Sequence, residues 1–139
     1  MTNDYLENLV KIGELKIDPS TDDEIEALIQ RGMLRIKDFK HPKLSIETRF
    51  DIAYGAAHAL CLAALKNLGY RSESRYIVFQ CAQHTIGLEP EHWRVMSDAH
   101  RHRNIAEYEG HIEVNEQLLE ALARVVDIVA ERVKGVVRR

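Results

Sequence analysis

The sequence predicts an all-α fold, an antiparallel four-helix-type bundle with extra helices at its N-terminal end. Apolar residues recur at helical spacing through nearly all of the 139 residues, and no stretch alternates as a strand does. Prolines stand at or just before the predicted helix starts, and glycines stand where helices should end. No linker, repeat or low-complexity tract divides the chain, so residues 1–139 are predicted to form one domain.

The first two helices are predicted over residues 4–16 and 21–40. The second begins at Thr21, because Thr21 and Glu24 have the spacing of a capping box. Gly32 lies inside it at a cost near 1 kcal/mol. The inward-facing residues are expected to be Leu6, Leu9, Val10 and Ile12 in the first helix and Ile25, Leu28, Ile29, Met33 and Ile36 in the second.

The third helix, predicted over residues 45–68, is the most hydrophobic. One face carries Phe50, Ala53, Tyr54, Ala57, Leu60, Cys61, Ala64, Leu65 and Leu68, and a second face carries Gly55, Ala59 and Ala63. A helix that is apolar on two sides is buried on two sides, and its small residues let another helix approach closely. His58 lies on this helix and is interpreted as a core histidine with its hydrogen bonds satisfied.

Three further helices are predicted. One follows the turn at residues 69–72 and includes Tyr76, Ile77, Phe79, Gln80 and Ile86. The next spans residues 91–111, and the last spans residues 114–136 with Leu118, Leu119, Leu122, Val125, Val126, Val129 and Val133 inward. Residues 1–43 are therefore predicted to be an N-terminal helical extension, and residues 45–136 are predicted to be the core bundle.

The charged residues are unevenly distributed. The formal net charge of −3 gives no overall attraction to nucleic acid or to an anionic membrane. Residues 1–30 carry eight acidic and two basic side chains, whereas residues 31–49 carry two acidic and six basic ones. The basic segment permits a local anion-binding face, although most segments of this kind are simply solvated. Its basic residues are Arg31, Arg35, Lys37, Lys40, Lys43 and Arg49.

Other features favour a cytoplasmic protein. Two isolated cysteines, Cys61 and Cys81, do not make a disulfide framework. The N-terminal residues do not resemble a signal peptide, and no apolar run reaches the ~20 residues that span a bilayer. No metal site is expected, because no two histidines among residues 84–111 are spaced to chelate from one helix face. No cofactor is expected either.

Arg103 is the exceptional residue of the helix at 91–111. It falls near the middle of an apolar arc, whereas Arg94 and Arg101 point the opposite way. A guanidinium that faces the core costs several kcal/mol unless it is paired. Arg103 is therefore expected either to pair within the fold, for example with Glu107, or to line a pocket or an interface. The residues of the apolar arc are Trp93, Val95, Met96, Ala99 and Ala106.

The segment RFDIAYGAAHAL at residues 49–60, together with Arg103-Asn104, resembles the HEPN superfamily of small helical domains over roughly residues 45–135. The resemblance implies a bundle that dimerises, with an arginine, a polar residue and a histidine from each copy in a shared cleft. Many members are metal-independent ribonucleases, often toxins paired with an antitoxin or a nucleotidyltransferase. Other members only bind nucleotides, RNA or proteins.

The motif of that family is matched in part. Arg103 and Asn104 match its first two positions, Tyr108 stands where the histidine is expected, and His111 lies too far along. Tyrosine, with a pKa of about 10, is a poor general base at pH 7. The candidate catalytic residues are Arg103, Asn104, Tyr108 and His111. The candidate nucleic-acid or nucleotide contacts are Arg94, His100, Arg101, His102 and Arg103.

Three functions follow from this resemblance and from the position of Arg103. The leading hypothesis is a homodimeric HEPN-like protein, of toxin–antitoxin or nucleic-acid-processing type, that binds RNA or nucleotide with weak or no hydrolysis. The first alternative is an active metal-independent endoribonuclease toxin. The second alternative is a non-catalytic protein-interaction module in which Arg103 and Glu107 form a buried pair.

Overall fold

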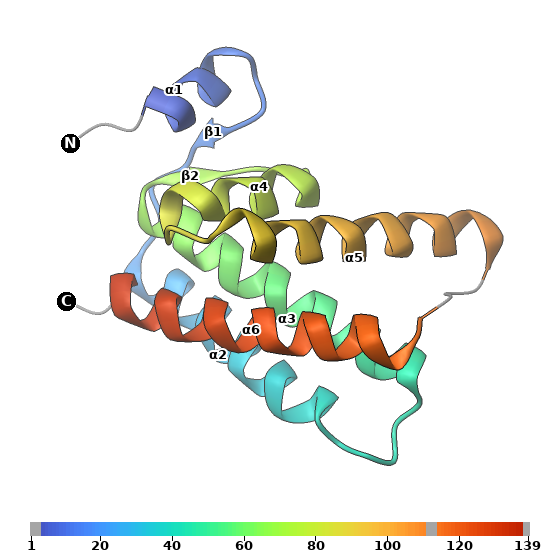
Figure 1. Cartoon of the computed structure of the whole chain (residues 1–139). Helices are drawn as coiled ribbons and strands as arrows, with labels where there is room; N and C mark the ends of the chain where they lie inside the picture. Colours follow the sequence, from blue (N-terminus) through green and yellow to red (C-terminus); the bar gives the residue numbers. More distant parts are fainter. Residues whose placement is uncertain (1–3, 111–113, 138–139) are drawn as a thin grey trace.

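The computed structural model describes residues 4–110 and 114–137, without the side chains of residues 106–109. In these ranges the chain is mostly helical, as predicted, and its helices pack extensively on one another (Figure 1). The helices are α1 (Asp4–Lys11), α2 (Asp22–Phe39), α3 (Ile46–Asn67), α4 (Arg75–Thr85), α5 (Pro90–Glu109) and α6 (Glu116–Val137). Two short strands, β1 (Lys16–Ile17) and β2 (Tyr70–Arg71), complete the fold.

The N-terminal region differs from the prediction in two ways. The first helix ends at Lys11 rather than near Lys16, because the chain turns at Gly13, whose φ of 85° lies in the left-handed region. Ile12, predicted to face inward, is therefore 70% exposed. The chain then forms β1, which pairs antiparallel with β2 and which the sequence did not reveal. Strands of two residues are too short to show an alternating pattern.

Helix α2 begins as predicted. The Thr21 side chain accepts a hydrogen bond from the backbone N–H of Glu24, and the Glu24 carboxylate accepts one from the Thr21 backbone. Losing such a cap costs typically ~1 kcal/mol. The division of the chain into an extension and a core stays a prediction, although α2 packs along α3 more extensively than any other helix does.

Helix α3 is the centre of the fold, in contact with α2, α4, α5 and α6. Its 22 residues include a set of buried alanines, which let neighbouring helices approach on several sides. The helices approach closely at Gly32 of α2, where a Cβ would lie 2.5 Å from Leu60 Cγ. Leu68, predicted to be buried, caps the end of α3 and is 49% exposed. The buried alanines are Ala53, Ala56, Ala57, Ala59, Ala63 and Ala64.

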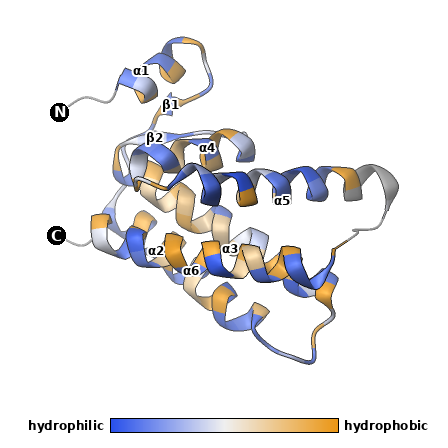
Figure 2. Cartoon of the chain, viewed as in Figure 1, coloured by the Kyte–Doolittle hydropathy of each residue, from blue (hydrophilic) through white to orange (hydrophobic). Residues whose placement is uncertain are grey.

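Helix α5 is mainly hydrophilic along the face in view, whereas α3 is apolar through most of its length (Figure 2). Helix α5 buries Met96 and Ala99, and it keeps Arg94 and Arg101 exposed as predicted. Arg132 of α6 links α6 to the connection between α4 and α5: its guanidinium donates to the Gly87 carbonyl at 2.7 Å and to a Glu89 carboxylate oxygen at 2.9 Å. No helix in the described ranges is long and apolar enough to cross a membrane.

Replacing Gly32 by alanine should destabilise the fold, although alanine is the better helix former by roughly 1 kcal/mol. The new methyl group overlaps the buried Leu60 side chain, and overpacking of this kind costs about 1–3 kcal/mol. Urea unfolding measures the change. The matched control is Gly135→Ala in α6, where a Cβ would have no atom within 4 Å. If Gly32→Ala were as stable to urea as Gly135→Ala, or more stable, the close approach of α2 and α3 would be contradicted.

The Arg132–Glu89 contact predicts a stability loss in acid. The Arg132 hydrogen bond, with the Glu89 backbone N–H and His92, lowers the pKa of Glu89 from 4.5 to about 2. The ionised Glu89 carboxylate therefore contributes fully to the free energy of unfolding above about pH 4.5, and this contribution is lost as the pH falls to about 2. The melting temperature of Arg132→Gln should fall less between pH 6 and pH 3 than that of the wild type. Lys40→Gln, which removes the exposed pair with Asp127, should keep the wild-type fall.

Candidate functional site

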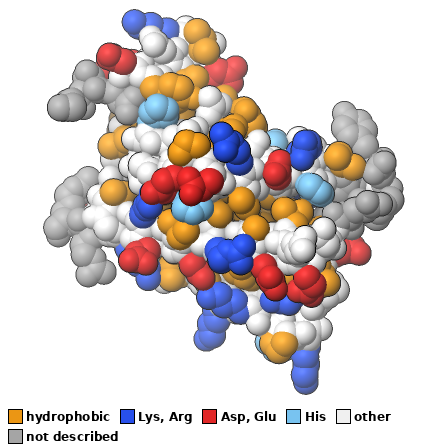
Figure 3. Space-filling view, viewed as in Figure 1, with side chains coloured by type: hydrophobic (Ala, Val, Ile, Leu, Met, Phe, Trp, Pro, Cys, Tyr) orange, Lys and Arg blue, Asp and Glu red, His pale blue; other side chains and the backbone are white. Residues whose placement is uncertain are grey.

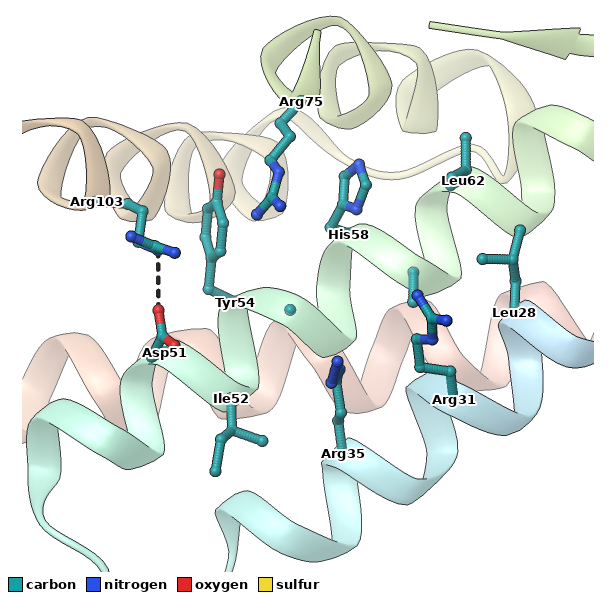
Figure 4. Close-up of a pocket in the computed structure, with 12 residues that line it drawn as sticks. Leu28, Arg31, Arg35, Asp51, Ile52, Tyr54, His58, Leu62, Arg75 and Arg103 are labelled. Carbon is teal, nitrogen blue, oxygen red and sulfur yellow. Dashed lines mark ion pairs between the residues drawn. The ribbon is translucent and has the colours of Figure 1, made fainter. Parts of the chain in front are cut away.

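The candidate site is a cavity of about 280 Å³ along the side of α3, with walls from α2, α4 and α5 (Figure 4). Four arginines line it: Arg31 and Arg35 from α2, Arg75 from α4 and Arg103 from α5. Asp51 is the one acidic residue among the described side chains that line it. The remaining lining residues are Leu28, Ile52, Tyr54, Gly55, His58, Ala59 and Leu62.

Three of these guanidinium groups have no acidic partner in the part of the chain that the structure describes. Among the described residues, no carboxylate lies within ion-pair distance of Arg31, Arg35 or Arg75. Surface arginines usually extend separately into solvent. These three arginines come from two helices and line one cavity (Figure 4). The cavity therefore concentrates positive charge in a protein whose net charge is negative. Walls of low dielectric strengthen the resulting field.

Arg103 is held at the wall of the cavity by α3. Its Nε atom lies 2.9 Å from Asp51 Oδ1, and its guanidinium carbon lies 5.7 Å from the centre of the Tyr54 ring. The side chain is 29% exposed, so it is neither sealed inside the subunit nor extended into bulk water. The partner of Arg103 seen here is Asp51 on another helix; the predicted pairing with Glu107 lies outside the described side chains.

Tyr54 separates Arg103 from Arg75, whose guanidinium carbon lies 5.6 Å from the same ring (Figure 4). The Tyr54 hydroxyl lies 2.8 Å from His100 Nδ1, and His100 Nε2 lies 3.2 Å from Asn104 Nδ2. These two contacts join Tyr54, His100 and Asn104 in one chain of hydrogen bonds. His100 and Asn104 therefore help to hold a ring that contacts two cavity arginines.

His58 lies one helical turn after Tyr54 on the cavity wall. Burial lowers the pKa of its imidazole from 6.5 to about 4, with further lowering by Arg75 and then by His100. The ring is therefore neutral at pH 7. Its environment is not that of the satisfied core histidine that the sequence favoured, because neither ring nitrogen has a hydrogen-bond partner among the described residues.

Gly55 of α3 lies beside the Arg35 side chain. A Cβ at residue 55 would lie 3.4 Å from both Cδ and Nε of Arg35. That distance is an ordinary van der Waals contact, so the Arg35 stem packs directly on this part of α3, and its guanidinium lines the cavity (Figure 4). The same glycine belongs to the small-residue face that the sequence singled out for close helix approach.

The other candidate residues of α5 lie elsewhere. Arg94, Arg101 and His102 do not line the cavity; Arg101 pairs with Asp98 at 3.0 Å, and His102 Nδ1 donates to the Asp98 carbonyl at 2.8 Å. On the face formed by α5 and α6, acidic and basic side chains are interspersed (Figure 3). The Tyr108 side chain and His111 lie outside the described residues, and the predicted roles of all five residues stay predictions.

Four residues of the cavity were not among the predicted site residues: Arg31, Arg35, Arg75 and His58. A signal was present for two of them, since Arg31 and Arg35 are four residues apart in the basic segment and share a helix face. Two other basic residues of that segment have structural contacts instead: Lys40 pairs with Asp127, and Arg49 donates to the Phe39 carbonyl at the end of α2.

Comparison with models of known protein families, with curated protein sequences and with solved structures gave no match. The cavity and the residues that line it are therefore the basis of the functional proposal.

The His58 environment predicts a low titration midpoint. Histidine NMR should place it near pH 4, well below the ordinary 6.5, because protonation would add a charge to a buried group beside Arg75. Arg75→Gln should raise the midpoint without restoring it fully, since the contribution of burial remains. Arg101→Gln, on the outer face of α5, should leave it unchanged. A midpoint close to 6.5 in the wild type would mean that the ring is solvated or paired.

Proposed function

We propose that this protein binds RNA or a nucleotide through phosphate groups in the four-arginine cavity, with little or no hydrolysis. The observation that carries the proposal is the convergence of Arg35, Arg75 and Arg103 from three helices on one hollow. Arginine is suited to phosphate because its planar fork donates two parallel hydrogen bonds and its charge is permanent. The clustering also costs stability through repulsion, which a bound anion would relieve.

The composition of the cavity supports a phosphate ester over a simple anion. Leu28, Ile52 and Leu62 line it beside the arginines, and all three are half-buried. Apolar contacts of this kind suit the sugar or base that accompanies a nucleotide phosphate, and an arginine plane can stack on a base. A ligand with both a charged part and a flat or apolar part would use both kinds of wall.

Binding is favoured over cleavage because none of the described side chains that line the cavity is a well-matched general base. Metal-free RNA cleavage requires removal of the proton from a 2′-hydroxyl, and the best base has a pKa near the working pH. His58 is neutral at pH 7, but its pKa of about 4 makes it a weak base. The resemblance to HEPN domains adds the expectation of a homodimer, of toxin–antitoxin or nucleic-acid-processing type, with an antitoxin or nucleotidyltransferase partner. Those expectations stay predictions.

Neutralising a cavity arginine should weaken binding of a labelled single-stranded RNA of about ten nucleotides. A hydrogen bond to a charged group contributes about 1.5–3 kcal/mol, so Arg35→Gln, Arg75→Gln and Arg103→Gln should each lower the affinity about tenfold or more. Fluorescence anisotropy at several salt concentrations measures it. Each lost phosphate contact should reduce the slope of log affinity against log salt by about 0.7. Nucleotides are tested as competitors.

Arg94→Gln and Arg101→Gln are the matched controls, because they remove the same charge from the outer face of α5. They should change the affinity less than twofold, on the order of the long-range effect of one screened charge. Circular dichroism and melting confirm that each variant is folded. Unchanged RNA and nucleotide affinity in the folded cavity variants would exclude the cavity as the binding site. A loss confined to the control variants would move the site to the outer face of α5.

A further inference from the structure

The imidazole of His58 is placed to contact whatever enters the cavity. The Phe79 ring packs against it in an edge-to-face arrangement, with ring centres 6.0 Å apart and planes at 84°. Neither ring nitrogen has a hydrogen-bond partner among the described residues, although the side chain is only partly exposed. The ring nitrogens are not among the buried polar atoms that lack a partner, so water in the cavity can pair with them. A ligand in the cavity would supply a partner in place of that water.

The groups around His58 are mostly cationic. Arg75 of α4 and His100 of α5 both oppose a positive charge on the ring. Asp51 is the nearest acid of the lining on the same helix, but it pairs with Arg103. The titratable and charged groups that face His58 or share its cavity are Arg31 and Arg35 from α2, Asp51 and Tyr54 from α3, Arg75 from α4, and His100 and Arg103 from α5.

We infer that His58 binds the ligand phosphate as an imidazolium, taking up one proton from solvent when the phosphate enters the cavity. This inference rests on the proposed function, and it deepens it by naming a contact residue and a proton linked to binding. The proton goes to a ring nitrogen, which then donates a charge-assisted hydrogen bond to a phosphate oxygen. No covalent bond forms or breaks.

The sign of the linkage follows from the charges. In the free protein, the pKa of His58 is held near 4 by burial, by Arg75 and by His100. A phosphate brings a negative charge next to the ring and offsets the field of Arg75, and both effects favour the charged imidazole. The pKa of His58 is therefore higher in the complex than in the free protein. By linkage, affinity must rise as the pH falls towards the range in which the complex holds the proton, at most tenfold per pH unit.

The test is titration calorimetry with a single-stranded RNA of about ten nucleotides that lacks terminal phosphates, since terminal phosphates titrate near pH 6 themselves. Runs at pH 5.5 and pH 7 in two buffers of different ionisation enthalpy count the protons taken up. Wild type should take up protons, more of them at pH 5.5, and its affinity should be higher there. His58→Gln should take up markedly fewer protons and should show a much flatter affinity–pH profile.

His102→Gln is the matched control, because His102 lies on the same protein outside the cavity; it should keep the wild-type proton uptake. RNA binding without proton uptake, or uptake of equal size in wild type and His58→Gln, would overturn the role of His58 and leave the proposed function standing. If all of the folded arginine variants kept the wild-type affinity, the proposed function itself would be overturned. Melting curves confirm that His58→Gln is folded before the comparison is made.

Discussion

The fold depends on the burial of α3 among its neighbours. Its alanines give the helix a narrow profile, so α2, α4 and α6 can each lie close to its axis. The contact of Gly32 with Leu60 shows how little space remains between α2 and α3. Dense packing of this kind leaves few alternative positions for the surrounding helices. The arginines of α2, α4 and α5 are therefore carried on elements whose positions are largely determined by α3.

That arrangement explains how a protein with a net negative charge has a concentrated positive site. Each arginine lies on a helix that is stabilised elsewhere by apolar contacts, so the bundle can tolerate repulsion between guanidinium groups. Asp51 and the Tyr54 ring offset part of the repulsion at Arg103, and the Tyr54 ring also faces Arg75. Arg31 and Arg35 have no such acidic partner among the described side chains. The remaining field is available to an anion.

Much of the fold could be read from local patterns. The capping box at Thr21 located the start of α2, and the two apolar faces of α3 predicted its central place. The pairing of β1 with β2 and the exposure of Ile12 could not be predicted, because they depend on a turn at Gly13 and on contacts with residues more than fifty positions away.

The site was harder to predict than the fold. Arg103 stood out because it breaks the pattern of its own helix. Arg31 and Arg75, by contrast, look like ordinary solvated residues on theirs, and only the packing of the helices brings them together. His58 was misread for a related reason: a histidine on an apolar helix usually finds a hydrogen-bond partner, and whether it does so is decided by the neighbouring helices.

Because the cavity arginines come from stretches of chain as far apart as Arg31 and Arg103, the unfolded polypeptide has no equivalent of this site. An anion that occupies it must bind the native state alone and shift the folding equilibrium, by about 2.7 kcal/mol when its concentration is a hundred times its dissociation constant. A rise in the melting temperature when unlabelled metabolites are added thus indicates that a ligand has bound to the native protein. The natural ligand can be sought that way without any prior assumption about its identity.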